Sequence, residues 1–323
     1  MPITGFIKIS REELNLEKTL VTGQNFRWKK RDTRKTVSHA EIEWIGIIEN
    51  LYVVSLSQND KGIKFTLLNE DLCFEEDKLI LEKALNHYFR LDIKIKPLYE
   101  LWSKSDKNFK KISQNFLGIR LLRQSLIENI FSFICSSNNN ISRITKMIET
   151  LAENYGKKLM IFDGIPIYAF PTVQALSKVS EDELRKIGFG YRAKSIVGTA
   201  KQIQKESQND DIESWIGDLK SLNYIMSKRK LMTLPGVGPK VADCICLMSL
   251  NHTDAVPIDT HVQQVTVRYY QTREELKSMN LSKKNSLSKK SYDTVGNFYR
   301  KLFGDYAGWA QTVLFCSNLL KKK

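Results

Sequence analysis

The pattern of hydrophobic and polar residues changes once along the chain, near residue 75. Before this point, apolar residues partly alternate with polar ones in four segments that polar turns separate: 23–30, 40–48, 51–58 and 62–69. A period of two places the apolar side chains on one face of a strand. The first part of the chain is therefore predicted to form an antiparallel β-sheet.

From about Glu75 onward, apolar residues recur three and four positions apart, which is the spacing of an amphipathic helix. The helical period is clear in 75–89, 125–137, 141–156 and 181–188. Ser180 and Glu183 have the spacing of a capping box, which predicts a helix start. The pattern predicts an α+β protein, with an antiparallel β-rich N-terminal domain over residues 1–113 and a helical domain over residues 114–323.

Composition and charge narrow the class of protein. The 323 residues suit two domains, and 42% hydrophobic with 27% charged residues is the balance of a folded globular protein. The 50 Lys and Arg against 36 Asp and Glu leave a net charge of +14, which favours a polyanionic partner such as nucleic acid. The chain lacks an apolar run of roughly 18 residues and a secretory signal pattern, so we expect an intracellular protein without a membrane segment.

Two further features are expected to be structural. The five cysteines are scattered and include no C-x-x-C pair, so we expect neither disulfides nor a zinc site. The Ser/Lys/Asn-rich stretch 277–291 is predicted to be a solvated loop between helices, although its lysines could also contact a phosphate backbone.

The stretch LPGVGPK, residues 234–240, separates two helical patterns. Gly236 and Gly238 flank Val237, and glycine permits a backbone bend in which several N–H groups point outward. Such a bend at a helix N-terminus can hold one phosphate without reading a base. A plain turn between helices explains the same residues, so both interpretations remain open at this point.

Lys240 lies in the first turn of the helix that follows. The positive end of the helix dipole and apolar neighbours such as Val241 both favour the neutral amine over the ammonium. A neutral amine is a nucleophile that can form a Schiff base with an aldehydic carbon. The alternative is a surface lysine that extends into solvent from the start of a helix.

Asp259 follows Pro257 and precedes the helical pattern of residues 260–270. Its side chain can cap that helix. A carboxylate beside the lysine can also stabilise the positive charge that grows on a sugar ring as a glycosidic bond breaks. The glycine turn, the lysine and the aspartate, in this order, form a more specific pattern than any one of them.

Other stretches complete a family pattern over nearly the whole chain: TGQNFRWK at 22–29, the segment 118–144, GFGYRAKSI at 188–196 and the segment 296–315. With LPGVGPKVADCICLM and VPIDTHV, they make the chain resemble the eukaryotic-type 8-oxoguanine DNA glycosylase/AP lyases of the helix-hairpin-helix glycosylase superfamily. The resemblance implies an N-terminal domain similar to the TATA-binding-protein fold, followed by a helical domain that carries the hairpin and the chemistry.

The resemblance assigns roles in DNA contact. Lys240 would be the nucleophile and Asp259 its electrostatic partner, while the hairpin of Gly236, Val237 and Gly238 would hold the DNA backbone. Four more residues would act where the nucleotide leaves the duplex. Asn138 would fill the vacated space, Tyr191 would wedge the duplex, and the donor-only guanidinium groups of Arg143 and Arg192 would bind the acceptors of the stranded cytosine.

The resemblance also assigns a base pocket. Phe315 and Cys244 would sandwich the purine, Gln311 would read its pairing edge, and the Gly23 carbonyl would accept the N7 hydrogen that the oxidised base has and guanine lacks. Read without the resemblance, Phe315 is an ordinary core aromatic.

His261 would lie on the phosphate side of this site. Asn318 stands where the family usually has the aspartate that orients the histidine. We expect the amide oxygen of Asn318 to orient the ring without supplying a counter-charge.

The implied function is excision of 8-oxoguanine in base-excision repair, after the base has been flipped from the duplex, with cytosine as the expected opposite base. Lys240 would attack the deoxyribose anomeric carbon, and the Schiff base would permit β-elimination 3′ to the abasic site. We expect no metal and no cofactor, a monomer, and double-stranded DNA containing 8-oxoguanine as the partner. The expected compartment is the nucleus, with the mitochondrion as the alternative.

Three alternatives remain. An endonuclease III-like glycosylase for oxidised pyrimidines shares the hairpin, lysine and aspartate, but that family commonly has four clustered cysteines after the aspartate, and here only Cys316 follows. A non-enzymatic helix-hairpin-helix module has no use for Lys240 or Asp259 in these places. An RNA-binding or structural basic protein explains the charge and none of the motifs.

Overall fold

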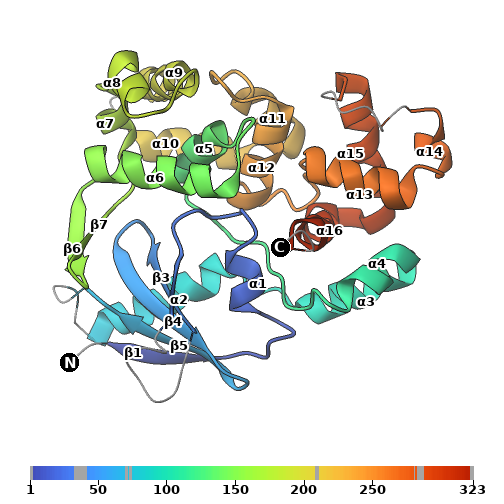
Figure 1. Cartoon of the computed structure of the whole chain (residues 1–323), viewed down its shortest axis with the longest axis horizontal. Helices are drawn as coiled ribbons and strands as arrows, with labels where there is room; N and C mark the ends of the chain where they lie inside the picture. The colour runs from blue at the N-terminus through green and yellow to red at the C-terminus, as the bar shows by residue number, and fades with distance from the viewer. Residues whose placement is uncertain are drawn as a thin grey trace.

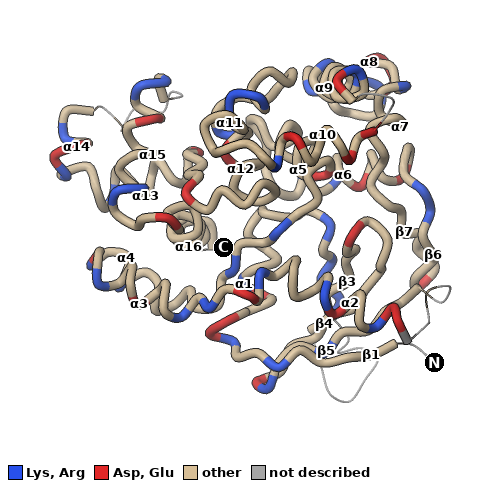
Figure 2. The backbone as a smooth tube through the Cα atoms, turned by 180° about the vertical axis from the view of Figure 1, so that it is seen from behind, with Lys and Arg blue, Asp and Glu red and all other residues tan. Residues whose placement is uncertain are grey.

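The computed structural model describes residues 3–32, 42–69, 72, 75–207, 211–279, 281 and 287–320. An antiparallel sheet lies beside a larger assembly of helices (Figure 1), which confirms the predicted α+β class. Lys and Arg occur on both parts, as do Asp and Glu (Figure 2). No helix of the described residues is long and apolar enough to span a membrane.

The sheet has five strands in the order β1-β5-β4-β3-β2. The strands are β1 (Thr4–Lys8), β2 (Lys29–Asp32), β3 (Ile42–Ile48), β4 (Tyr52–Gln58) and β5 (Gly62–Leu67). Trp44 pairs with Leu56 and Ile48 pairs with Tyr52, so these apolar side chains share one face of the sheet. Two helices, α1 (Leu16–Leu20) and α2 (Glu75–Tyr88), contribute apolar side chains to the same core.

The helices beyond the sheet surround a second hydrophobic core. They are α3 (Ile95–Ser105), α4 (Lys107–Ser113), α5 (Leu126–Cys135), α6 (Ile141–Tyr155), α7 (Val173–Ser177), α8 (Glu181–Lys186), α9 (Arg192–Glu206), α10 (Ile212–Ser221), α11 (Tyr224–Leu231), α12 (Pro239–Ser249), α13 (Thr260–Tyr270), α14 (Glu274–Lys277), α15 (Lys289–Phe303) and α16 (Ala307–Leu320). The four helices expected from their period are present. The capping box is also confirmed, because Ser180 and Glu183 exchange side-chain and backbone hydrogen bonds at the start of α8.

A β-hairpin interrupts the helical part, where the pattern predicted helices throughout. Strands β6 (Lys158–Phe162) and β7 (Ile165–Tyr168) pair antiparallel and project from α6 toward the sheet (Figure 1). Asp163 and Gly164 form the turn with φ of 49° and 75°. An Asp-Gly pair between short apolar runs is a strong hairpin signal, and it was present in the sequence.

The predicted loop needs correction, and the predicted domain boundary stays open. The loop predicted over 277–291 is too long, because α15 begins at Lys289, while residues 280 and 282–286 of it lie outside the described residues. The boundary between residues 113 and 114 stays a prediction. Phe109 of α4 packs edge-on against Phe303 of α15, with ring centroids 5.5 Å apart, so hydrophobic packing joins α4 to the helices that follow.

The structure describes four of the five cysteines. Cys135, Cys244, Cys246 and Cys316 are buried free thiols, and Cys73 lies outside the described residues.

Candidate active site

The glycine turn joins α11 to α12, as the sequence predicts. Gly236 has a φ of 80°, and a Cβ atom there would lie 2.6 Å from the Cβ of Ser195, so both backbone conformation and space require glycine. Val237 is buried and anchors the turn, whereas Gly236 and Gly238 are exposed. The turn therefore presents backbone to the surface immediately before the N-terminus of α12.

Lys240 is the second residue of α12 and is half-buried. Its Nζ atom lies 4.9 Å from the centroid of the Phe133 ring and donates a 3.3 Å hydrogen bond to Ser136 Oγ. The amine thus lies against α5 and the residues that follow it, rather than extending into solvent.

Asp259 is the N-cap of α13. Its Oδ1 atom accepts a 2.8 Å hydrogen bond from the backbone N–H of Val262. The capping role expected from the sequence is confirmed. The cap also fixes the carboxylate at one wall of the cavity that Lys240 lines.

We call this cavity, of about 60 Å³, the lysine cavity. It lies where the segment before β2 meets α5, α12, α13 and α16. Its lining residues are Thr22, Gly23, Gln24, Phe133, Lys240, Cys244, Leu247, Met248, Pro257, Asp259, Val262, Gln311, Thr312 and Phe315. Six of the residues predicted from the sequence are therefore together: Gly23, Lys240, Cys244, Asp259, Gln311 and Phe315.

Gly23 has a left-handed backbone conformation, with a φ of 71°. A Cβ atom would lie 3.1 Å from Ile141 Cδ1, so the site is both strained and crowded for any other residue. The next residue, Gln24, holds the segment in place. Its amide accepts from Leu122 N at 3.0 Å and donates to Arg120 O at 2.9 Å.

Cys244 and Gln311, in the other walls of the cavity, do not compete with Lys240 as nucleophiles. Burial raises the pKa of the Cys244 thiol to about 11, with Asp259 adding to the shift and Lys240 opposing it. The thiol is therefore protonated at neutral pH and is not a competing nucleophile. Gln311 is only 4% exposed, so it places a polar amide at an otherwise mainly apolar wall.

The residues predicted to contact DNA do not line the lysine cavity. Asn138 is exposed and has a φ of 47°, a conformation that asparagine tolerates better than most residues. The Tyr191 hydroxyl donates to Ser137 O at 3.0 Å, and Arg192 Nη2 donates to Ser137 O at 2.5 Å and Asn138 O at 3.1 Å. Arg192 is 3% exposed, so in this structure it supports the 137–138 turn. Arg143 is exposed in the first turn of α6.

His261 packs edge-on against Phe315, with ring centroids 5.5 Å apart. Asn318 approaches His261 Nδ1 through its amide nitrogen, at 3.1 Å, so the predicted contact through the amide oxygen is wrong. The same nitrogen donates to Gln264 Oε1 at 3.2 Å, which accounts for the orientation of the amide. With Nδ1 as the acceptor, the neutral imidazole carries its proton on Nε2.

Sequence reasoning missed a buried polar network behind Lys240. Asp243, 1% exposed, accepts from Tyr224 Oη at 2.7 Å, Lys228 Nζ at 2.8 Å and Tyr292 Oη at 2.7 Å. Burial raises the pKa of Asp243, and the nearby Lys228 ammonium opposes that rise. The signal was a carboxylate in the apolar stretch VADCICLM, since a buried charge requires partners.

The described residues include no group of three or more His, Cys, Asp or Glu side chains placed to hold a metal ion.

The chain is similar to known proteins over nearly its whole length. Residues 6–130 match the family model for the 8-oxoguanine DNA glycosylase N-terminal domain, and residues 131–289 match the model for HhH-GPD superfamily base excision DNA repair proteins. The N-glycosylase/DNA lyase of Saccharomyces cerevisiae is 39% identical over 98% of this chain and 86% of its own length. N-glycosylase/DNA lyase OGG1 of Arabidopsis thaliana is 37% identical over 98% of this chain and 80% of its own.

A solved structure is similar over the whole chain. It is the Clostridium acetobutylicum 8-oxoguanine glycosylase/lyase in complex with double-stranded DNA containing cytosine opposite 8-oxoguanine. Its sequence is 28% identical, the TM-score is 0.80, and the match covers 100% of this chain and 99% of the other.

Proposed function

The chain belongs to the 8-oxoguanine DNA N-glycosylase/DNA lyase family, and we propose that Lys240 and Asp259 carry out its reaction. The protein is a base-excision repair enzyme that removes 8-oxoguanine from double-stranded DNA and acts as a DNA lyase. The observation that supports the two catalytic assignments is that one cavity is lined by both side chains.

In the first chemical step, the Lys240 amine forms a bond to C1′ of the deoxyribose as the glycosidic bond breaks. The displaced base leaves with the bonding electrons and takes up a proton. Asp259 stabilises the positive charge that develops on the sugar ring. The cap bond to Val262 supports this role, because it holds the carboxylate without neutralising it.

The lyase step follows from the bond between lysine and sugar. Ring opening gives a protonated imine between Nζ and C1′, which makes the C2′ hydrogen acidic. Loss of that proton expels the 3′ phosphate by β-elimination and breaks the strand. The contact with the Phe133 ring supports the assignment, because an aromatic face stabilises the iminium cation.

Base recognition requires a flipped-out nucleotide at the lysine cavity, which has to widen from about 60 Å³ to admit a purine. Phe315 and Cys244 would contact the purine faces, Gln311 its pairing edge, and the Gly23 carbonyl its N7–H. The left-handed backbone at Gly23 supports this assignment, because the absence of a side chain lets a base approach the main chain.

The duplex contacts are assigned to the residues around the 137–138 turn. Asn138 would occupy the vacated space, Tyr191 would wedge the duplex, and Arg143 and Arg192 would bind the opposite cytosine. Arg192 would have to exchange its backbone contacts for base contacts. His261 would donate from Nε2 to a phosphate, as would the N–H groups after Gly236.

We also propose that the enzyme acts as a monomer, because one chain supplies every residue of the proposed mechanism. The nuclear location stays a prediction.

Covalent trapping tests the proposal. Borohydride reduces an imine between protein and sugar to a stable amine. Wild type should cross-link to a duplex that contains 8-oxoguanine opposite cytosine, whereas Lys240→Gln should bind the duplex without cross-linking. Equal trapping of both proteins would assign the imine to another amine.

A further inference from the structure

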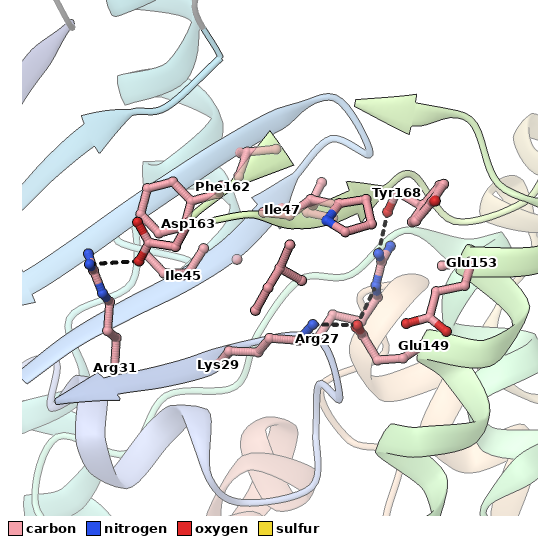
Figure 3. Close-up of a pocket in the computed structure, with 16 residues that line it drawn as sticks. Arg27, Lys29, Arg31, Ile45, Ile47, Glu149, Glu153, Phe162, Asp163 and Tyr168 are labelled. Atoms are coloured by element: carbon pink, nitrogen blue, oxygen red, sulfur yellow. Dashed lines mark hydrogen bonds and ion pairs between the residues drawn. The ribbon is translucent and has the colours of Figure 1, made fainter. Parts of the chain in front are cut away.

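A second cavity, of about 210 Å³, lies between the sheet and the hairpin β6–β7 (Figure 3). We call it the sheet cavity. Three elements form it: the face of β2, β3 and β4 that points away from the sheet core, the C-terminal half of α6, and the hairpin. Most of its lining is apolar: Ile45, Ile47, Val53, Ala152, Phe162, Ile165, Pro166 and Ile167.

Charged side chains close one side of this cavity. Lys29 and Arg31 lie two residues apart on β2 and therefore point to the same face of the sheet, and Arg27, just before β2, lines the same cavity. Lys29 Nζ lies 2.6 Å from Glu149 Oε2 on α6, and Arg31 Nη2 lies 2.7 Å from Asp163 Oδ2 on the hairpin. Figure 3 shows these ion pairs bridging the sheet to the opposite wall.

Arg27 is different, because it is buried and only partly bonded. Its Nη2 atom donates to the Tyr168 carbonyl, but Nε and Nη1 make no hydrogen bond although both are buried. The carboxylates of Glu149 and Glu128 lie 3.5 Å from Nε and 3.9 Å from Nη1, close enough for charge compensation. A buried donor without an acceptor is unfavourable, so a ligand that draws Arg27 toward the cavity it lines would give these donors an acceptor.

We propose that the sheet cavity binds a small, uncharged aromatic molecule that carries one carbonyl acceptor for Arg27. The volume exceeds that of an apolar cavity of about 150 Å³ known to admit benzene. The acceptor is uncharged because ion pairs already match Arg27, Lys29 and Arg31 with Glu128, Glu149 and Asp163, and an added anion would face these carboxylates. The cavity also lies between the sheet and the helical part, and ligand pockets occur preferentially at domain interfaces.

Occupancy of the sheet cavity affects the lysine cavity through one segment. Phe26, the neighbour of Arg27, packs edge-on against Phe133 with ring centroids 6.0 Å apart. Lys240 Nζ lies over that same Phe133 ring. A ligand that moves Arg27 therefore shifts the ring that supports the amine. This coupling rests on the proposed role of Lys240, whereas binding in the sheet cavity does not.

The binding test uses benzamide, a one-ring molecule with a neutral carbonyl, with benzoate and toluene as comparisons. Ligand-observed NMR should give a benzamide dissociation constant on the order of 1 mM for wild type and for Lys240→Gln. Benzoate and toluene should each bind at least about fivefold more weakly, because one adds a negative charge and the other lacks the acceptor.

Cavity-filling variants decide where benzamide binds. Ala152→Leu fills the cavity from α6 and should weaken binding at least about tenfold. Asn154→Leu adds the same side chain at an exposed position of the same helix and should bind as wild type does. Ile47→Phe repeats the filling from the sheet side, in case Ala152→Leu does not fold. Equal binding by the filled and control proteins, or no binding to wild type, would overturn the proposed site.

Single-turnover excision tests the coupling. Saturating benzamide should change the excision rate at least twofold in wild type and Asn154→Leu, but not in Ala152→Leu. Binding without a rate change would overturn the coupling and leave the site. Benzamide binding together with normal trapping of Lys240→Gln would overturn the proposed catalytic function and again leave the site.

Discussion

Tyr292 donates a 2.7 Å hydrogen bond to the buried carboxylate of Asp243. Its oxygen also accepts a 3.2 Å hydrogen bond from the backbone N–H of Ile258. Asp243 lies one helical turn after Lys240, and Ile258 immediately precedes Asp259. One hydroxyl group therefore ties together the two segments that carry the proposed nucleophile and its carboxylate.

Tyr292→Phe should slow excision as well as destabilise the fold. The variant keeps the ring but leaves the Ile258 N–H without its acceptor, at a cost of roughly 1–3 kcal/mol in the free energy of unfolding. Tyr224→Phe is the matched control, because it removes a hydrogen bond to Asp243 without touching Ile258. Denaturant unfolding should show a larger destabilisation in Tyr292→Phe than in Tyr224→Phe, and single-turnover excision should be slower only in Tyr292→Phe. Equal slowing would assign the effect to Asp243 alone.

Asp259→Asn should separate the cap from the charge. Asparagine caps helices about as well as aspartate, so the free energy of unfolding should change by no more than about 1 kcal/mol. Base release should slow by two or more orders of magnitude, because the developing positive charge loses its counter-charge. Thermal melting and single-turnover excision check both effects. A variant that melts early but keeps normal activity per folded molecule would show that Asp259 is only a cap.

The Gly23 carbonyl should distinguish 8-oxoguanine from an analogue without the N7–H. 8-Oxo-7-deazaguanine keeps the 8-oxygen but has C–H at that position, so the carbonyl loses its donor. The analogue should bind Lys240→Gln protein about 10- to 100-fold more weakly than the lesion does, in a fluorescence-anisotropy titration. Equal affinity would mean that the pocket senses the 8-oxygen instead.

Gly23→Ala tests the same segment from the protein side. The left-handed conformation should cost roughly 1–2 kcal/mol in the free energy of unfolding, and the added Cβ atom would crowd Ile141. Affinity for lesion DNA should fall more than affinity for undamaged duplex. A parallel loss for both duplexes would assign the residue to general folding.

Arg192→Ala should reduce excision opposite cytosine more than excision opposite adenine, because the lost bonds are to one base. Some loss should be common to both substrates, since Arg192 also holds the carbonyls of Ser137 and Asn138. Lys194→Ala, at an exposed position of the same helix, is the control and should weaken both duplexes alike. The measurement is the ratio of the excision rate opposite cytosine to the rate opposite adenine. The same ratio in Arg192→Ala and Lys194→Ala would contradict the assignment of Arg192 to cytosine.

Acid should destabilise the protein through His252. Burial lowers the pKa of His252 below its ordinary value of 6.5, and Asp254 only partly opposes this. The unfolded chain then binds the proton more tightly, so the contribution is complete above pH 6.5 and is lost as the pH falls from 6.5 through the lowered pKa. His252→Gln should flatten the dependence of unfolding free energy on pH in that range. An unchanged slope would assign the acid sensitivity elsewhere, and His87, whose pKa is also lowered by burial, is the next group to replace.

Local features were readable from the sequence because their physics is local. The alternation before residue 75 predicted β3, β4, β5 and the start of β2 but not β1, and the period of three and four predicted α2, α5 and α6. The glycine turn and the cap at Asp259 depend on residues within one helical turn of each other, so both were found. The pattern did not predict α1, because five residues are too few to show a helical period. It also did not predict the hairpin at Asp163 and Gly164, because the part of the chain after residue 75 was interpreted as helical throughout.

Some of the site residues were indicated by their own chemistry, and others only by the resemblance to a family. Residue chemistry alone singled out Lys240 and Asp259, but it left a surface lysine and a simple cap as alternatives. The resemblance to a family, and not the pattern, named Gly23, Gln311 and Phe315. Only the tertiary structure brings these residues to one cavity, because their separation along the chain is bridged by the packing of α12, α13 and α16 against the segment before β2.

Tertiary structure alone also decided the partners of the buried polar groups. Asp243 was visible as a charge in an apolar helix, yet its hydroxyl and ammonium donors come from α11 and α15. The orientation of Asn318 depends on Gln264 as well as on His261. The sheet cavity exists because ion pairs join β2 to α6, through Lys29 and Glu149, and to the hairpin, through Arg31 and Asp163. A sequence determines which groups need partners, whereas the packing of distant elements determines which partners they find.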